Sequence, residues 1–138
     1  MSGSTILPDT VFTLSAALGN SLASTLDGDW SLQLWADANN NNQMDVGDSF
    51  LAQQFGSNGT ATNAAGGEWA LNSVSFDSGL NSSYNGMQLI VFLNNYGTAS
   101  SQSYYDSVLL ESVPEPSRLL LACAALQLVV LRRRRERA

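Results

Sequence analysis

Oxygen-bearing side chains recur at regular intervals in the segment DANNNNQMDVGD, which covers residues 37–48. Positions 1, 3, 5, 9 and 12 of this segment carry Asp37, Asn39, Asn41, Asp45 and Asp48. Carboxylate and amide oxygens at these intervals are ligands that Ca²⁺ takes from a loop that coils around the ion. The spacing therefore indicates a candidate calcium site, and calcium is the one cofactor that the sequence suggests.

A second interpretation of the same segment is a solvated hairpin connection, because Asn and Asp favour turns without any bound ion. The segment resembles the calcium loops of some secreted β-sandwich domains, with two differences. Asn42 stands where those loops usually have glycine, and Asp48 stands where the longer glutamate usually supplies two oxygens. A calcium ion here would have a structural role, since it would neutralise acids in a part of the chain without cations.

Charge divides sharply between the two ends of the chain. All six basic residues are arginines from Arg118 onward, and Glu136 is the one acid of twelve that lies beyond that point. Residues 1–117 therefore cannot neutralise phosphates, which makes nucleic acid a poor partner. The chain has no histidine, the commonest general base, and its single cysteine, Cys123, has no second cysteine to pair with. No paired-acid motif is present either, so we expect a protein that is not an enzyme.

Short apolar segments separated by Gly- and Asn-rich turns have the character of strands. They lie at residues 11–18, 30–37, 49–55, 68–76, 87–96 and 104–112. Residues 87–96 are apolar on both faces, which predicts a central, buried strand. This pattern predicts an all-β fold, an antiparallel β-sandwich of the jelly-roll type over residues 11–112, preceded by a polar segment at residues 1–10.

The chain ends with a proline-bracketed acid, an apolar run and a cluster of arginines. Residues 118–131 are predicted to be a C-terminal hydrophobic helix and membrane segment, although a span usually needs about 20 residues. Positive charge stays in the cytoplasm, so residues 1–117 would face outward. The arginines concerned are Arg132, Arg133, Arg134, Arg135 and Arg137. Pro114 and Pro116 supply no backbone N–H, which predicts a stiff stretch outside any sheet just before the membrane segment.

Residues 113–138 as a whole resemble the PEP-CTERM sorting signal of Gram-negative bacteria. The tripeptide and its predecessor are Val113, Pro114, Glu115 and Pro116, and the apolar run and the arginines follow in the expected order. The resemblance implies that exosortase, a membrane protease or transpeptidase, recognises residues 113–117 and removes the tail. It also implies a transient stay in the inner membrane, with residues 132–138 as a basic cytoplasmic tail. The exported product would reach the cell envelope or the extracellular polysaccharide matrix.

The preceding residues resemble, less specifically, the jelly-roll domains that many such proteins carry, which are similar to carbohydrate-binding modules. An aromatic-Asp-x-Val pattern at residues 105–108 and the segment TVFTLSAALGN at residues 10–20 carry this resemblance. A full jelly roll has about eight strands, and residues 1–10 do not form a secretory signal. We therefore expect a sandwich that is incomplete at its N-terminus, either in a fragment or in a chain whose start is misassigned.

Aromatic residues suggest a role for the sandwich. The tryptophans could stack on sugar rings, although aromatic residues lie in sandwich cores more often. Trp35 and Tyr96 are the favoured glycan contacts because both border loops. The predicted function is a non-catalytic exported protein with a structural or weak glycan-binding role. Two alternatives stay open, namely an accessory β-sandwich of a secreted glycan-active enzyme and a plain C-terminally anchored membrane protein.

Overall fold

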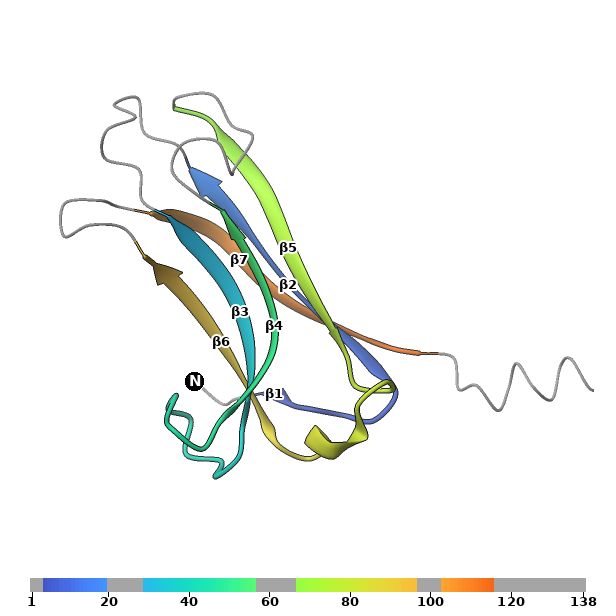
Figure 1. The fold of residues 1–138 in the computed structure, drawn as a ribbon. Helices are drawn as coiled ribbons and strands as arrows, with labels where there is room; N and C mark the ends of the chain where they lie inside the picture. Colours follow the sequence, from blue (N-terminus) through green and yellow to red (C-terminus); the bar gives the residue numbers. More distant parts are fainter. Residues whose placement is uncertain (1–3, 20–28, 57–66, 97–102, 116–138) are drawn as a thin grey trace, which may run out of the picture.

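Two antiparallel sheets packed face to face form the part of the chain that the computed structural model describes, which is residues 4–19, 29–56, 67–96 and 103–115 (Figure 1). One sheet has four strands in the order β1-β6-β3-β4, and the other has three in the order β5-β2-β7. The strands are β1 Ser4–Thr5, β2 Thr10–Gly19, β3 Trp30–Asp37, β4 Ser49–Gly56, β5 Trp69–Asp77, β6 Gln88–Asn95 and β7 Tyr104–Pro114.

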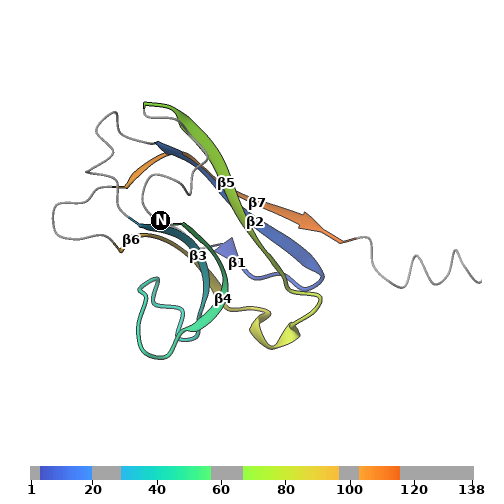
Figure 2. The ribbon, with the colours of Figure 1, turned by 45° about the horizontal axis from the view of Figure 1, so that its top comes forward.

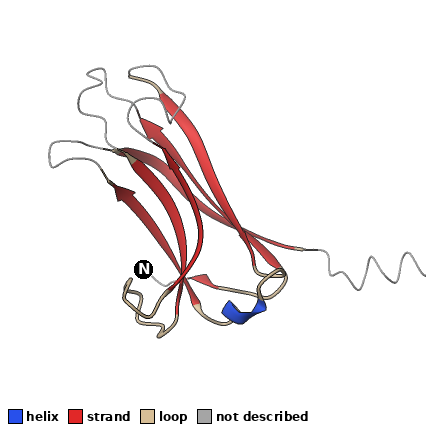
Figure 3. Ribbon diagram, in the orientation of Figure 1, coloured by secondary structure: helices blue, strands red, loops and turns tan. Residues whose placement is uncertain are grey.

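The all-β prediction is confirmed, and each predicted strand is present with ends that shift by no more than two residues. A single 3-10 turn at Ser82–Tyr84 is the only helical element among the described residues (Figure 3). No helix in those residues is long and apolar enough to cross a membrane. The predicted membrane segment at residues 118–131 lies outside the described residues.

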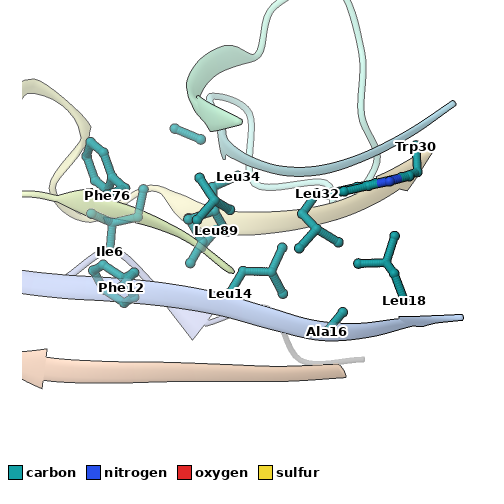
Figure 4. Packing of buried hydrophobic residues seen from close by; sticks show 12 residues of the cluster. Ile6, Phe12, Leu14, Ala16, Leu18, Trp30, Leu32, Leu34, Phe76 and Leu89 are labelled. Carbon is teal, nitrogen blue, oxygen red and sulfur yellow. The ribbon is translucent and has the colours of Figure 1, made fainter. Parts of the chain in front are cut away.

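Strand β2 shows most directly how the sequence pattern becomes a sheet with two faces. Its even-numbered residues from Thr10 to Leu18 are buried, and the residues between them are half-buried. Successive side chains of a strand point to opposite faces, so this alternation places one whole face in the core. In Figure 4, Leu14 and Leu18 of β2 point across the gap toward Leu32 of β3. The apolar area that these contacts remove from water is the main source of stability.

The sandwich begins before residue 11, which was its predicted first residue. Ser4 and Thr5 form β1, which pairs with β6, and Ile6 is fully buried in the core. The Ile6 amide donates to the Met87 carbonyl at 2.8 Å, and the Gly86 amide donates to the Ile6 carbonyl at 2.9 Å. Residues 4–10 therefore belong to the sandwich, and they carry the chain from one sheet to the other.

The buried hydroxyl of Ser78 secures this crossing. It accepts a hydrogen bond from the Thr10 amide at 3.0 Å and lies 2.6 Å from the Leu7 carbonyl, to which it can donate. The Ser78 amide donates to the Thr10 carbonyl at 3.1 Å. Buried backbone groups need such partners, because leaving them unpaired is costly.

The sandwich also extends past residue 112, which was its predicted last residue. Strand β7 continues through Pro114, with Val113 paired to Val11 and Pro114 paired to Thr10 of β2. The Glu115 amide then donates to the Asp9 carbonyl at 2.7 Å. The expected stretch outside any sheet is therefore wrong for Val113 and Pro114. Proline is tolerated here because β7 is an edge strand of its sheet and Pro114 is its last residue.

Strand β6 lies between two strands, as predicted for a central strand, but it is less buried than predicted. Among the described residues, β1 borders β6 only at Gln88 and Leu89, and β3 borders its other side along the whole length. Leu89 is buried, but the following apolar residues are only half-buried. The apolar residues on both faces of β6 thus face the core on one side and a partly exposed surface on the other.

Tyr105 links the two sheets near the end of β2 that is farthest from Thr10, where it pairs with Leu18. Its phenol reaches from β7 to the four-stranded sheet, where it donates to the Asn94 carbonyl of β6 at 2.6 Å. Half-burial of the ring raises the pKa of Tyr105, because the phenolate would lose hydration there. The neutral phenol is therefore the form that holds the sheets together.

Candidate functional site

The face of the four-stranded sheet that points away from the core carries an unusual set of side chains. Trp30, Leu32, Leu34 and Ala36 of β3 enter the core, so the residues between them lie on the outer face. Of these, Ser31 and Gln33 are nevertheless buried. Their neighbours on the same face must cover them, because the opposite sheet lies on the other side.

The strand register identifies these neighbours, since directly paired residues share one face of a sheet. Ser31 lies between Phe55 of β4 and Asn94 of β6, and Gln33 lies between Gln53 and Phe92. Trp35 lies between Phe50 and Ile90, with a bulge in β4 at this point. We call this surface the aromatic face and define it by its rings, which are those of Trp35, Phe50, Phe55, Phe92 and Tyr96.

Gln33 holds the centre of the aromatic face through both ends of its amide. Its oxygen accepts a hydrogen bond from the indole nitrogen of Trp35 at 2.7 Å. Its nitrogen lies 3.0 Å from the Ser31 hydroxyl and 2.5 Å from the Tyr96 phenol oxygen, and donates to both. The rings of Trp35 and Phe50 meet edge to face, with centroids 5.3 Å apart. The side chains at the centre are therefore held in fixed positions.

The outer rings of the aromatic face remain open to solvent. Phe55 is 70% exposed, Tyr96 is 52% exposed, and Phe50 is about half exposed. Hydrogen bonding with the side chains of Ser31, Asn94 and Gln33 lowers the pKa of Tyr96, because these contacts favour the phenolate. Exposed apolar rings around a buried polar centre are typical of a binding surface for a ligand with both apolar and hydroxyl groups.

The structure brings together the two glycan contacts expected from the sequence, Trp35 and Tyr96, through the shared partner Gln33. Sequence reasoning missed Gln33 and the phenylalanines. Gln33 lies two residues before Trp35, so the alternation of β3 could have placed both on one face. The tryptophans do not form one surface, because Trp30 is in the core and Trp69 is on the outer face of the other sheet.

The predicted calcium loop connects β3 to β4 and projects from one end of the four-stranded sheet (Figure 2). Left-handed backbone at Asn40 and Asn42, with φ of 57° and 61°, lets it coil. Asn tolerates this conformation better than most residues. One carboxylate oxygen of Asp37 accepts from the Asn42 amide at 2.7 Å, and Asp48 accepts from the amides of Ala38 and Asp45 at 3.1 and 2.8 Å.

Asp45 is the third carboxylate acceptor within this loop, where the side-chain oxygens of Asn39 and Asn41 also accept, from the amides of Asn41 and Gln43 at 3.0 and 2.7 Å. The side-chain amides of Asn39 and Asn41 donate to one of its oxygens at 2.8 and 2.9 Å, and the Gly47 amide donates to the other at 3.0 Å. The hydrogen bond from Gly47, followed by those from Asn39 and Asn41, lowers the pKa of Asp45. Each of these contacts favours the ionised carboxylate.

The five predicted ligands share this loop but are not assembled as a metal-binding set. Within the described residues, no group of three or more His, Cys, Asp or Glu side chains is arranged to hold a metal ion. Asn39 and Asn41 turn their nitrogens toward Asp45, whereas a cation requires oxygens. The structure thus places these residues close together and leaves the calcium interpretation as a proposal.

The predicted sorting residues are only partly within the described chain. Val113 and Pro114 belong to β7, and Glu115 follows it with its amide bonded to Asp9. Pro116 and the arginines at positions 132–135 and 137 lie outside the described residues.

Comparison with known proteins supports the fold of this chain. No protein-family model matches it, and no curated protein matches it in sequence. Among solved structures, it is similar to a cyclase from Fischerella sp. TAU, with 23% identity, a TM-score of 0.59, and 80% of this chain covered. A second structure, the apo form of a cyclase from Fischerella sp., has 21% identity and a TM-score of 0.56. This chain spans only about half the length of either, 52% and 51%, and the likeness at this identity concerns the fold alone.

Proposed function

We propose that this chain is a non-catalytic exported protein with a β-sandwich of the jelly-roll type, which binds extracellular polysaccharide through its aromatic face. The observation that carries the proposal is the network in which Gln33 positions Trp35 and Tyr96 on an exposed surface. Sugar rings present apolar C–H faces and hydroxyl edges, so aromatic rings and amides together can contact both. Binding is the role favoured over catalysis, because this face carries amides, a hydroxyl and rings in place of acids.

Export and sorting form the second part of the proposal. The residues from Val113 onward resemble a signal that exosortase recognises, and the arginines beyond residue 131 suit the cytoplasmic side of a membrane. The tripeptide Pro-Glu-Pro lies at the end of the last strand, because Pro114 is the final residue of β7 and the Glu115 amide bonds to the Asp9 carbonyl. The sandwich would be displayed outside the inner membrane and later released to the envelope or the matrix.

Removal of single rings should weaken binding to polysaccharide. We expect Tyr96→Ala and Phe50→Ala each to lower the association constant about tenfold, a loss of about 1.4 kcal/mol. The constant can be measured by affinity electrophoresis in gels that contain extracellular polysaccharide or a neutral glucan. Trp69→Ala is the matched control, because Trp69 is 53% exposed on the other sheet. Equal losses in the control and in the aromatic-face variants would contradict the role of this face, as would full binding by Tyr96→Ala.

The sorting proposal is tested by the intact mass of the mature protein recovered from native cells and their medium. We expect the recovered protein to lack the apolar run and the arginines, because exosortase would remove everything after the Pro-Glu-Pro region. A mass that still includes Arg132 to Ala138, found only in membranes, would instead establish a plain membrane anchor. A product that is joined to a separate catalytic domain would support the accessory role in a glycan-active enzyme.

A further inference from the structure

Asp37 has a carboxylate that the rest of the described structure does not neutralise. The residue is fully buried, and one of its oxygens, Oδ1, has no hydrogen-bond partner among the described residues. Its other oxygen, Oδ2, accepts from the Asn42 amide at 2.7 Å, so the carboxylate is directed into the loop. Residues 1–117 contain no lysine, arginine or histidine that could pair with it. A buried carboxylate oxygen without hydrogen bond or counter-charge is strongly unfavourable.

We propose that residues 37–48 bind a calcium ion, with the free Oδ1 of Asp37 as the buried ligand that anchors the site. A cation at this position would supply the charge that Asp37 lacks. It would also explain why Asp45 and Asp48 share a short loop in a part of the chain, residues 1–117, that has no basic side chain. This inference goes beyond the proposed polysaccharide binding and depends on different residues.

Asn39 and Asn41 would have to reorient to complete the ligand set, because their oxygens accept from the backbone amides of Asn41 and Gln43 at 3.0 and 2.7 Å. Asn39 and Asn41 both donate from their nitrogens to Asp45, at 2.8 and 2.9 Å. These two amide nitrogens therefore lie where a cation bound to Asp45 would lie. A half-turn of each amide would bring its oxygen to the position that the nitrogen now occupies, at the cost of the hydrogen bond that this oxygen accepts from the backbone. A cation that replaces these donors at Asp45 would then meet amide oxygens from Asn39 and Asn41 together with the carboxylate of Asp37.

The donor set favours calcium among the metal ions. All candidate ligands are oxygens, which hard cations prefer, and the described residues contain neither histidine nor cysteine. Ca²⁺ accepts about 6–8 oxygens in flexible geometry, whereas Mg²⁺ requires a nearly ideal octahedron and keeps its waters. A coiled loop of amides and carboxylates therefore suits Ca²⁺ better than Mg²⁺.

The site would also stabilise the end of the four-stranded sheet. Ala36 pairs with Ser49 where the loop leaves β3 and enters β4. The side-chain oxygen of Asn40 accepts from the Gln88 amide at 3.0 Å and so connects the loop to β6. An ion held by the loop would therefore restrain the three strands that also carry the aromatic face.

Calcium chloride added to the metal-free full-length chain provides the test. We expect about 1 mM Ca²⁺ to raise the melting temperature by about 5 °C or more, because a ligand that binds only the folded state stabilises it. Isothermal titration calorimetry should show one binding event, and Mg²⁺ at the same concentration should give a clearly smaller shift. A melting temperature that Ca²⁺ leaves unchanged would overturn the proposal.

Asp37→Asn separates a metal ligand from a merely structural residue. The amide keeps an acceptor for the Asn42 N–H but removes the buried charge, so the melting temperature without calcium should stay the same or rise. The calcium-induced shift should disappear. Glu111→Gln is the control that removes one exposed charge from the other sheet, and its calcium response should match that of the wild type. A full calcium response in Asp37→Asn would overturn the assignment, and if this variant does not fold, Asp45→Asn provides the same comparison at an exposed position.

Discussion

Replacement of Ile6 by aspartate should lower the free energy of unfolding by about 4 kcal/mol or more, which is a large part of the stability of a small domain. Ile6 is fully buried in the core between the two sheets, and both of its backbone groups bond to the segment before β6. An aspartate there would bury a charge, and no lysine or arginine precedes residue 118 to pair with it. Urea denaturation followed by circular dichroism measures the change.

Leu7→Asp is the matched control for this experiment, because Leu7 is the next residue and is 51% exposed. We expect it to change the free energy of unfolding by no more than about 0.5 kcal/mol, as is usual for surface substitutions. A small effect of Ile6→Asp would show that residues 4–10 are dispensable for the sandwich. Similar large losses in both variants would point to a general intolerance of charge in this segment, which the structure does not predict.

Leu14→Ala should lower the free energy of unfolding by about 3–5 kcal/mol. Leu14 is fully buried at the middle of β2, which is the central strand of its sheet with β5 and β7 as neighbours. Strands on both sides hold the backbone of β2, so the surroundings can collapse only partly into the space that the side chain leaves. The cost therefore includes a cavity in addition to the lost burial of the methyl groups.

Leu71→Ala removes the same atoms from an exposed site and serves as the control. Leu71 lies on β5, directly paired with Ala17 of β2, and is 74% exposed on the outer face. We expect a change within about 0.5 kcal/mol. If Leu71→Ala cost as much as Leu14→Ala, the outer face of the three-stranded sheet would have to be covered in solution, and the assignment of the core would be wrong.

Local patterns in the sequence were sufficient to predict most of the strands. Strand β2 alternates apolar and small or polar residues, and this period of two is the geometry of a strand with one buried face. The Asn-rich segment at residues 37–48 was predicted as a loop, because Asn and Asp accept the turn and left-handed conformations that the structure shows there. In both cases the information lies within a few neighbouring residues.

Pairing between distant segments could not be predicted in the same way. Ile6 is bonded to Met87, and Val113 is paired to Val11, across most of the chain. Ser4–Thr5 is too short to show a period, and Pro114 locally argues against a strand. Each joins a sheet because the edge of another strand has unpaired backbone N–H and C=O groups. The position of that edge depends on the tertiary fold and cannot be deduced from the neighbouring residues.

The candidate sites show the same division. The sequence by itself determined the composition of the loop, the absence of cations before residue 118, and the aromatic residues that border the loops. Only the tertiary structure decided that Trp35 and Tyr96 share Gln33 and that Trp69 lies on the opposite sheet. It also decided that one oxygen of Asp37 is buried with no hydrogen-bond partner among the described residues. The physical reason is that residue types and spacing act along the chain, whereas burial and shared hydrogen bonds arise when strands far apart in sequence are packed side by side.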